Sequence, residues 1–225
     1  TTNITKDPTA LGIDPSVTMD DSIKNIGLFG LAQRSAYSDD STRSDVIMVL
    51  TVDNKHKKLK ITSILRDSYV SIEGENSSGE HVDYMDKINA AYAEGGYELA
   101  IRTLNRNFGL NIMDYVTIDF TDTAAIVDAF GGVEISLTAE EKWEINQNLW
   151  NLSQETEGLI KDSDFLADAN GQVVDLAGAE YSESVELLNG NQGVAYGRIR
   201  NIDFDDQRVE RQQSVFKALM NRVTQ

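Results

Sequence analysis

The chain has 225 residues, of which 40% are hydrophobic, and its 37 acidic and 20 basic residues give a net charge of −17 at pH 7. This length can bury a full core and fits one large domain or two small ones, and we predict one. The negative charge argues against binding DNA or RNA across a broad face, which relies on a spread of Lys and Arg side chains. The sequence has no cysteine, which excludes disulfides and thiolate chemistry, and no apolar run approaches the roughly 18 residues of a membrane span.

The segment 1–24 is polar and holds both prolines of the chain. This composition is typical of a linker. We therefore interpret residues 1–24 as a polar linker that follows a missing membrane anchor, although a processed signal peptide would leave the same kind of start. Residues 25–225 form the predicted folded domain.

Strands and a broken helix are predicted in the first half of this domain. Apolar runs predict three strands, at 25–31, 45–52 and 59–65. The last two form a hairpin, because a short polar turn joins them. Helical spacing follows over 86–108, where Gly95 and Gly96 divide the pattern into two helices.

Strands and helices alternate again in the second half. The predicted order is a strand at 115–120, a helix at 121–130, a strand at 133–137, a partly helical and irregular insertion at 139–186, and a closing helix at about 206–223. Strands that alternate with helices indicate a layered α/β domain.

The most distinctive segment is 198–213, which holds four arginines and three aspartates in 16 residues. Arginines gathered in one place of an acidic chain indicate an anion site. If the segment is extended at Arg198 and Arg200, these two side chains point the same way.

The second half of this segment has helical spacing. Arg208, Arg211 and Gln212 fall on one side of a helix that starts near Asp205 or Asp206 as the N-cap. Guanidinium groups beside a helix N-terminus suit phosphate, because both offer N–H donors and positive charge. A solvated helix with ion pairs along one face is the alternative.

Seven motifs occur along the chain in an order that resembles one known family. They are Asn25–Gly30 (NIGLFG), Arg43–Met48 (RSDVIM), Leu65–Asp67 (LRD), Asp86–Tyr92 (DKINAAY) with Gly95 and Gly96, Val127–Asp128 with Gly131–Val133, Leu188–Gly190 (LNG), and Arg198–Arg200 (RIR) with Arg208, Arg211 and Gln212. In this respect the chain is similar to the LytR-CpsA-Psr family of Gram-positive cell-envelope proteins.

The resemblance implies both a fold and a function. The fold would be a single α/β domain whose central mixed sheet is flanked by helices and encloses a hydrophobic lipid tunnel. The protein would be a membrane-anchored, extracytoplasmic phosphotransferase that moves wall teichoic acid or capsular polysaccharide from a polyprenyl-pyrophosphate carrier to peptidoglycan, usually with Mg²⁺. A polyprenyl-pyrophosphate hydrolase and a non-catalytic binder of polyprenyl phosphate remain alternatives, whereas the acidic charge disfavours a transcriptional regulator.

The resemblance also implies site residues. Those expected to surround and act on the pyrophosphate are Arg43, Asp45, Arg66, Arg198, Arg200, Asp205 and Arg208. Those expected to bind the substrate are Lys87, Arg211, Gln212, Tyr92, Phe120 and Phe130. Asp45 and Asp205 match positions associated with the metal or with ordering the arginines, and hard carboxylate oxygens are what Mg²⁺ requires.

Plainer interpretations exist for several of these residues. Simple ion pairs would join Asp45 to Arg43, Arg66 to Asp67, and Lys87 to Asp86. The candidate tunnel lining has helical spacing, and such residues more often form an ordinary core. It comprises Tyr92, Leu99, Ile101, Leu104, Phe120, Ile126, Val127 and Phe130.

One departure from the family pattern affects the metal. The family usually has Gly-x-Asp-x-Arg after its first strand, whereas this chain reads Gly30–Arg34 as Gly-Leu-Ala-Gln-Arg. Ala32 cannot bind a metal. Either the chain has diverged, or the alanine is an engineered replacement, or Asp39 or Asp40 takes the missing role.

Overall fold

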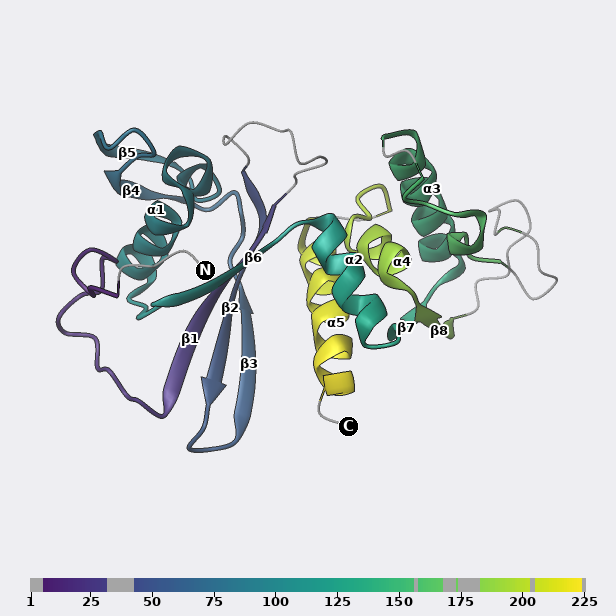
Figure 1. Cartoon of the computed structure of the whole chain (residues 1–225), viewed down its shortest axis with the longest axis horizontal. Helices are drawn as coiled ribbons and strands as arrows, with labels where there is room; N and C mark the ends of the chain where they lie inside the picture. The colour runs from purple at the N-terminus through teal and green to yellow at the C-terminus, as the bar shows by residue number, and fades with distance from the viewer. Residues whose placement is uncertain are drawn as a thin grey trace. The chain divides into compact units, whose positions relative to one another are not determined.

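The chain divides into two compact units, Thr1–Asp119 (unit 1) and Phe120–Gln225 (unit 2), in a computed structural model (Figure 1). The structure describes residues 6–31, 43–155, 158–167, 173, 183–202 and 205–223. Each unit has its own hydrophobic core. From the length we predicted one domain, but a chain of this length can form one large domain or two small ones. Length alone does not indicate which elements pack together.

The main sheet of unit 1 has four strands in the order β3-β2-β1-β6. They are β1 (Ile23–Leu31), β2 (Ser44–Asp53), β3 (Lys58–Ser63) and β6 (Asp114–Ile118). β2 is antiparallel to both β1 and β3, whereas β6 is parallel to β1, so the sheet is mixed. The predicted hairpin of β2 and β3 is confirmed.

A second, two-stranded sheet in unit 1 precedes the first helix. It pairs β4 (Tyr69–Glu75) with β5 (His81–Lys87). The sequence prediction missed both strands, because only one face of β4 is buried and its apolar alternation, at Val70 and Ile72, is short. For the same reason we placed the start of the following helix at residue 86, whereas that residue belongs to β5.

The helix α1 (Ala90–Phe108) has the predicted break at its paired glycines. Gly96 has a φ of +61°, a left-handed conformation that favours glycine, and Gly95 also departs from helical angles. Beyond the break, Leu99, Ile101 and Leu104 are fully buried in the core of unit 1. The helix ends at Gly109, which is left-handed as well.

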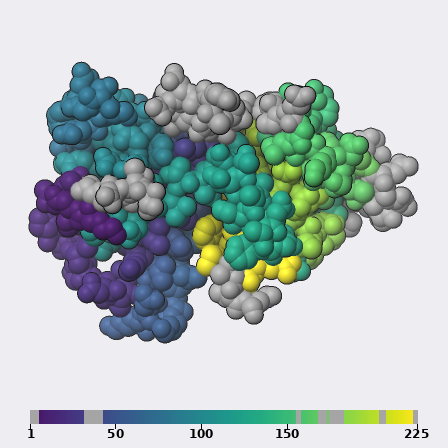
Figure 2. Space-filling view, in the orientation of Figure 1, coloured from purple at the N-terminus to yellow at the C-terminus, as the bar shows by residue number. Residues whose placement is uncertain are grey.

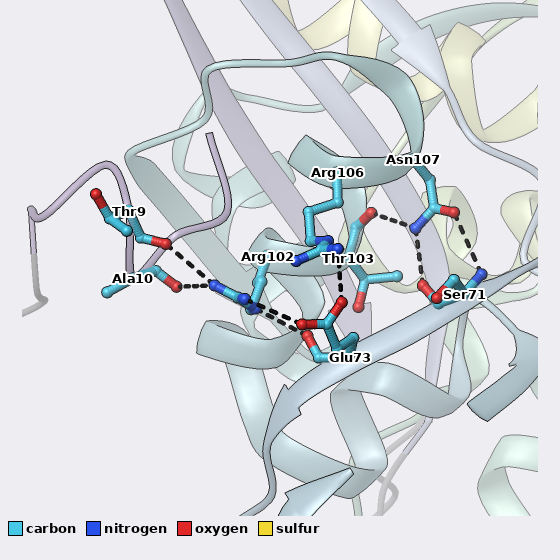
Figure 3. Close-up of polar contacts among 8 residues, drawn as sticks. All are labelled: Thr9, Ala10, Ser71, Glu73, Arg102, Thr103, Arg106 and Asn107. Carbon is cyan, nitrogen blue, oxygen red and sulfur yellow. Dashed lines mark hydrogen bonds and ion pairs between the residues drawn. The ribbon is translucent and has the colours of Figure 1, made fainter. Parts of the chain in front are cut away.

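The segment interpreted as a linker contributes to this core where the structure describes it. Leu11 is 1% exposed and Ile13 is 8% exposed. Arg102 of α1 donates from Nη1 to the carbonyl oxygens of Thr9 and Ala10, at 3.1 and 3.0 Å (Figure 3). Composition does not reveal this packing, since two apolar side chains are enough to anchor a polar segment.

Arg102 and its neighbour Arg106 also connect α1 to β4 (Figure 3). Arg102 Nε donates to the carbonyl oxygen of Glu73 at 2.8 Å, and Arg106 forms an ion pair with the Glu73 carboxylate. Asn107 donates to the carbonyl oxygen of Ser71 at 2.8 Å. These two arginines therefore bind protein groups and hold α1 against β4.

Unit 2 is mainly helical and has one small antiparallel sheet. Its elements are α2 (Phe120–Ala129), β7 (Val133–Leu137), α3 (Ala139–Glu155), the 3-10 turn η1 (Asp162–Asp164), β8 (Ser184–Leu188), α4 (Gly190–Gly197) and α5 (Asp205–Val223). The strand at 133–137 and the closing helix are confirmed. The predicted insertion begins with the 17-residue helix α3, whose Ile145, Leu149 and Leu152 are buried in the core of unit 2.

Candidate functional site

Two predicted site residues of unit 1 form a direct ion pair. Asp45 is the second residue of β2, and Arg66 follows the end of β3. Because the two strands are antiparallel, the start of β2 lies beside the end of β3. Arg66 Nη1 donates to Asp45 Oδ1 at 2.9 Å, and the side chains are 22% and 28% exposed.

Asp67 and Lys87 extend this pair into a network. Asp67 Oδ2 accepts from Arg66 Nε at 3.3 Å, and Asp67 Oδ1 accepts from Lys87 Nζ. Tyr69 pairs with Lys87 across the β4–β5 hairpin, which brings Lys87 next to the loop 64–68 between β3 and β4. The hydrogen bond from Lys87 holds the pKa of the Asp67 carboxyl below its usual value. We call Asp45, Arg66, Asp67 and Lys87 the unit 1 network.

The unit 1 network contains one of the simple ion pairs expected from the sequence, and it also joins predicted site residues to one another. Arg66 does pair with Asp67, as the simpler interpretation expected, but it also pairs with Asp45. Lys87 contacts the Asp67 carboxylate rather than that of Asp86, which instead accepts from the Lys87 backbone N–H at 2.7 Å. Two carboxylates thus orient one guanidinium group, which is a suitable preparation for binding phosphate oxygens.

Arg43 lies at the same end of the sheet. It is exposed and immediately precedes β2. Burial raises the pKa of the Tyr84 hydroxyl on β5, and the charge of Arg43 partly opposes that rise. The charge of Arg43 therefore acts on the Tyr84 hydroxyl of the β4–β5 hairpin.

In unit 2, one face of α3 carries three polar residues at helical spacing: Glu141, Glu144 and Asn148. We call them the α3 polar stripe. Glu141 Oε1 accepts from Arg211 Nε at 3.0 Å, and these side chains are 14% and 7% exposed. The Arg211 guanidinium also lies 6.0 Å from the centre of the Tyr196 ring. Arg211, predicted to bind substrate, is therefore a buried cation with protein partners in this arrangement.

The other two residues of the α3 polar stripe, Glu144 and Asn148, contact α4 and the loop between α4 and α5. Glu144 is 2% exposed and accepts from Asn201 Nδ2 at 3.1 Å. Asn148 Nδ2 donates to the carbonyl oxygen of Ala195 in α4 at 3.1 Å. The stripe thus attaches α4, the following loop and α5 to α3. The sequence prediction missed it, because a partly helical and irregular insertion at 139–186 does not locate a helix face.

Arg198 is the C-cap residue of α4, with φ −98° and ψ −6°. The condition of an extended segment is therefore not met at Arg198, and the fully buried Ile199 separates it from the exposed Arg200. The Arg198 guanidinium lies 4.8 Å from the centre of the Phe120 ring.

The sequence does contain a signal for α4 that we missed. The Asn189 side chain accepts from the Gln192 backbone N–H at 2.9 Å, and the Gln192 side chain accepts from the Asn189 backbone N–H at 2.8 Å. This reciprocal capping box follows from an Asn with a Gln three residues later, a known mark of a helix start.

The first turns of α5 hold the remaining predicted residues. Arg208 is 4% exposed, and Gln212 Nε2 donates to the carbonyl oxygen of Gly197 at 3.3 Å. α5 starts at Asp205, as the N-cap prediction approximately placed it. The side chain of Asp205 lies outside the described part of the structure.

The model of the LytR-CpsA-Psr family matches residues 2–225. The chain belongs to this family. The polyisoprenyl-teichoic acid–peptidoglycan teichoic acid transferase TagV of Bacillus subtilis is 28% identical over 184 residues, which make up 81% of this chain and 39% of TagV. The chain thus spans well under half the length of this LytR-CpsA-Psr relative.

Solved structures of the family have the same fold. TagT bound to LIIa-WTA has a TM-score of 0.63 at 24% identity, over 92% of this chain and 66% of that chain. The family protein YwtF (TagT) with bound octaprenyl pyrophosphate lipid has a TM-score of 0.60 at 22% identity, over 92% and 68%. The predicted α/β class with a central mixed sheet is confirmed.

The family's lipid tunnel stays a prediction for this chain. Of the candidate lining residues, Leu99, Ile101, Leu104 and Val127 are buried in the two cores, whereas Ile126 and Phe130 are 36% and 45% exposed. The Tyr92 hydroxyl lies 3.1 Å from Thr117 Oγ1. Unit 2 has a cavity of about 290 Å³, whose walls include Thr121, Asp128, Lys161 and Asn191. None of the candidate tunnel-lining residues lines this cavity.

The Mg²⁺ that the family resemblance implies would need carboxylate donors from this chain. Within the residues that the structure describes, no three His, Asp or Glu side chains are grouped so that they could hold a metal ion. Asp45 already uses Oδ1 to accept from Arg66. Mg²⁺ usually needs only one or two protein carboxylates, and both Ala32 and the Asp205 side chain lie outside the described residues, so Mg²⁺ binding stays a prediction. The described helices are also too short or too polar to cross a bilayer.

Proposed function

We propose that the protein is an extracytoplasmic phosphotransferase that moves an anionic glycopolymer, wall teichoic acid or capsular polysaccharide, from a polyprenyl-pyrophosphate carrier to peptidoglycan. Membership of the LytR-CpsA-Psr family and the similarity to TagV support this proposal. The similarity in fold to TagT with bound octaprenyl pyrophosphate supports the lipid carrier. The location outside the cytoplasmic membrane and the tether by an upstream helix belong to the same proposal.

The observation that carries the proposal is the Arg66 guanidinium held between the carboxylates of Asp45 and Asp67. A guanidinium fork with fixed orientation binds two phosphate oxygens with little loss of entropy. Lys87 adds a second positive charge, since its side chain is 51% exposed and its ammonium group contacts one oxygen of Asp67. These groups bind an anion at one edge of the sheet of unit 1.

The proposed reaction joins an acceptor hydroxyl to the phosphorus that carries the glycopolymer. A new P–O bond forms, the bond from that phosphorus to the bridging oxygen breaks, and polyprenyl phosphate leaves with the electron pair. The hydroxyl proton is released. Charge grows on the leaving phosphate and spreads over the transferred group, so fixed cations such as Arg66 lower the barrier. Arg198, Arg200 and Arg208 are proposed for the same role on the basis of the family pattern.

Two activities must be measured together to test this proposal. The protein would be incubated with a glycopolymer-bearing polyprenyl pyrophosphate, with and without peptidoglycan fragments. Polymer attached to the fragments supports the transferase. Release of phosphate without attachment would favour a hydrolase, and tight binding without either product would favour the non-catalytic binder that Ala32 suggests.

A further inference from the structure

The turn of the β2–β3 hairpin concentrates positive charge in a strongly acidic chain. Four of the ten lysines, Lys55, Lys57, Lys58 and Lys60, lie within six residues, while the net charge of the chain is −17. All four are exposed, as are the other residues from 54 to 60 (slate blue, at the lower edge of Figure 2). We call these four residues the lysine hairpin.

The positive charge of this hairpin is only partly neutralised by its surroundings. Within the part of the chain that the structure describes, none of the four ammonium groups forms an ion pair. Two carboxylates reduce this charge in part: Asp53, which lies opposite Lys58 and binds His56 at 2.7 Å, and Asp20, whose charge interacts with that of Lys55. Salt limits the influence of more distant charges to about 8 Å at physiological ionic strength. An anion that approaches this hairpin is therefore attracted by the lysines, although the chain as a whole is negatively charged.

The β-ladder separates the lysine hairpin from the unit 1 network. Asp45 and Asp53 lie at opposite ends of β2, eight residues apart in a regular strand. At about 3.3 Å per residue, this distance is roughly 25 Å. A small anion bound at Arg66 cannot reach the lysines, whereas a long polyanion can.

We propose that the lysine hairpin is a docking surface for the polyanionic chain of the glycopolymer. This inference rests on the proposed function, because it assigns the hairpin to the same substrate at a distance from the reacting pyrophosphate. Register places Lys58 beside Asp53 and Lys60 beside Thr51, so the two lysines share one face of β3, while Lys57 lies in the turn with a φ of +55°. Ammonium groups distributed in this way suit repeated anionic groups rather than a single phosphate.

An anionic bilayer is a less suitable partner for this surface. Binding at a membrane interface needs an apolar face as well as lysines. Leu59 is 48% exposed, but register places it on the other face of β3, beside Val52 and Lys24, away from Lys58 and Lys60. A simpler alternative is that lysines on an edge strand only prevent pairing with other chains, since β3 is at the edge of its sheet.

The test uses fluorescently labelled poly(glycerol phosphate) and anisotropy at low ionic strength. The hairpin variant carries Lys57→Ala, Lys58→Ala and Lys60→Ala. A matched control carries Lys6→Ala, Lys161→Ala and Lys217→Ala, three exposed lysines elsewhere, and so has the same net charge. An exposed ion pair changes affinity about two- to fivefold, so we expect roughly tenfold or greater weakening in the hairpin variant and little change in the control.

Two further measurements separate this inference from the proposed function. Binding of a polyprenyl pyrophosphate without polymer should be the same in the hairpin variant as in the parent, which also shows that the variant is folded. Neutral dextran should not bind. Equal binding of the polyanion by hairpin variant and parent would overturn the inference and leave only protection of the edge strand. Loss of binding to phosphatidylglycerol vesicles, with polyanion binding unchanged, would also overturn it in favour of a bilayer.

Discussion

The Arg66 guanidinium donates to Asp45 at 2.9 Å and thereby links the loop after β3 to the start of β2. The pair is about three-quarters buried, so solvent screens it only in part. Asp67 holds a second nitrogen of the same group. Arg66 therefore has a fixed orientation before any ligand binds, which lowers the entropic cost of recognising phosphate.

Replacing Arg66 with alanine should weaken binding of polyprenyl pyrophosphate about 10- to 100-fold, because a charge-assisted contact contributes roughly 1.5–3 kcal/mol. Arg66→Lys should recover only part of the loss, since an ammonium group cannot make the two-pronged contact. Isothermal titration calorimetry measures both. Arg222→Ala, which removes a partly exposed arginine of unit 2, is the control. Parent-like affinity in Arg66→Ala would mean that the unit 1 network does not bind the pyrophosphate.

The lowered pKa of Asp67 predicts the direction of a pH effect. The folded chain holds this proton less tightly than the unfolded chain, whose Asp67 titrates near 3.8. The contribution of Asp67 to stability is therefore fully present above that pH and is lost as the pH falls through the lower folded-state value. The difference in unfolding free energy between parent and Asp67→Asn should shrink as the pH is lowered below 3.8. A difference independent of pH would show that the carboxylate charge is irrelevant.

Glu144 is predicted to support the arginine segment through Asn201. Glu144→Ala removes a charge-assisted hydrogen bond to the Asn201 amide at a position where the Glu144 side chain is buried, which should cost about 1–3 kcal/mol of unfolding free energy. Glu144→Gln keeps an acceptor oxygen and should cost less. Urea unfolding measures both, with the exposed Gln147→Ala as a control on the same helix. If alanine and glutamine cost the same, the hydrogen bond to Asn201 is not what stabilises this region.

Leu11 tests whether the N-terminal segment is part of unit 1. Its side chain is 1% exposed, and truncating a buried leucine to alanine costs about 2–5 kcal/mol. Met19→Ala, at a residue 51% exposed, should be nearly neutral. A loose linker would give the opposite result, with Leu11→Ala as harmless as the control.

The missing carboxylate at Ala32 predicts weak metal binding. Mg²⁺ sites usually use one or two protein carboxylates, so the loss of one is a large fraction of the contribution of the protein. Ala32→Asp should raise the affinity for Mg²⁺, and Asp45→Ala should lower it. Equilibrium dialysis measures this without any substrate. Unchanged affinity in Ala32→Asp would mean that Asp39 or Asp40 already serves, or that the protein does not use the metal.

Local patterns in the sequence predicted local structure well. The β2–β3 hairpin, the break at Gly95 and Gly96, and the strand at 133–137 each follow from apolar spacing or from residues that end an element. Long-range contacts were harder to predict. Asp67 was weighed only as a partner of Arg66, whereas the fold makes it a bridge to Lys87, because β4 and β5 pair.

The same limit applies to the arginine segment. Its residue types predicted an anion site, but spacing could not show that Glu141 binds Arg211 or that Glu144 binds Asn201. Both contacts join α3 to residues more than 50 positions further along the chain. Such contacts depend on how helices pack, which charge patterns along one segment do not encode.

The most direct test of the proposed function is transfer of a labelled glycopolymer from polyprenyl pyrophosphate to peptidoglycan fragments by the purified protein. We predict labelled fragments and an equal amount of polyprenyl phosphate, with Arg66→Ala forming both more slowly. Tight lipid binding with no labelled fragments and no polyprenyl phosphate, under conditions where TagV of Bacillus subtilis forms both, would contradict the account.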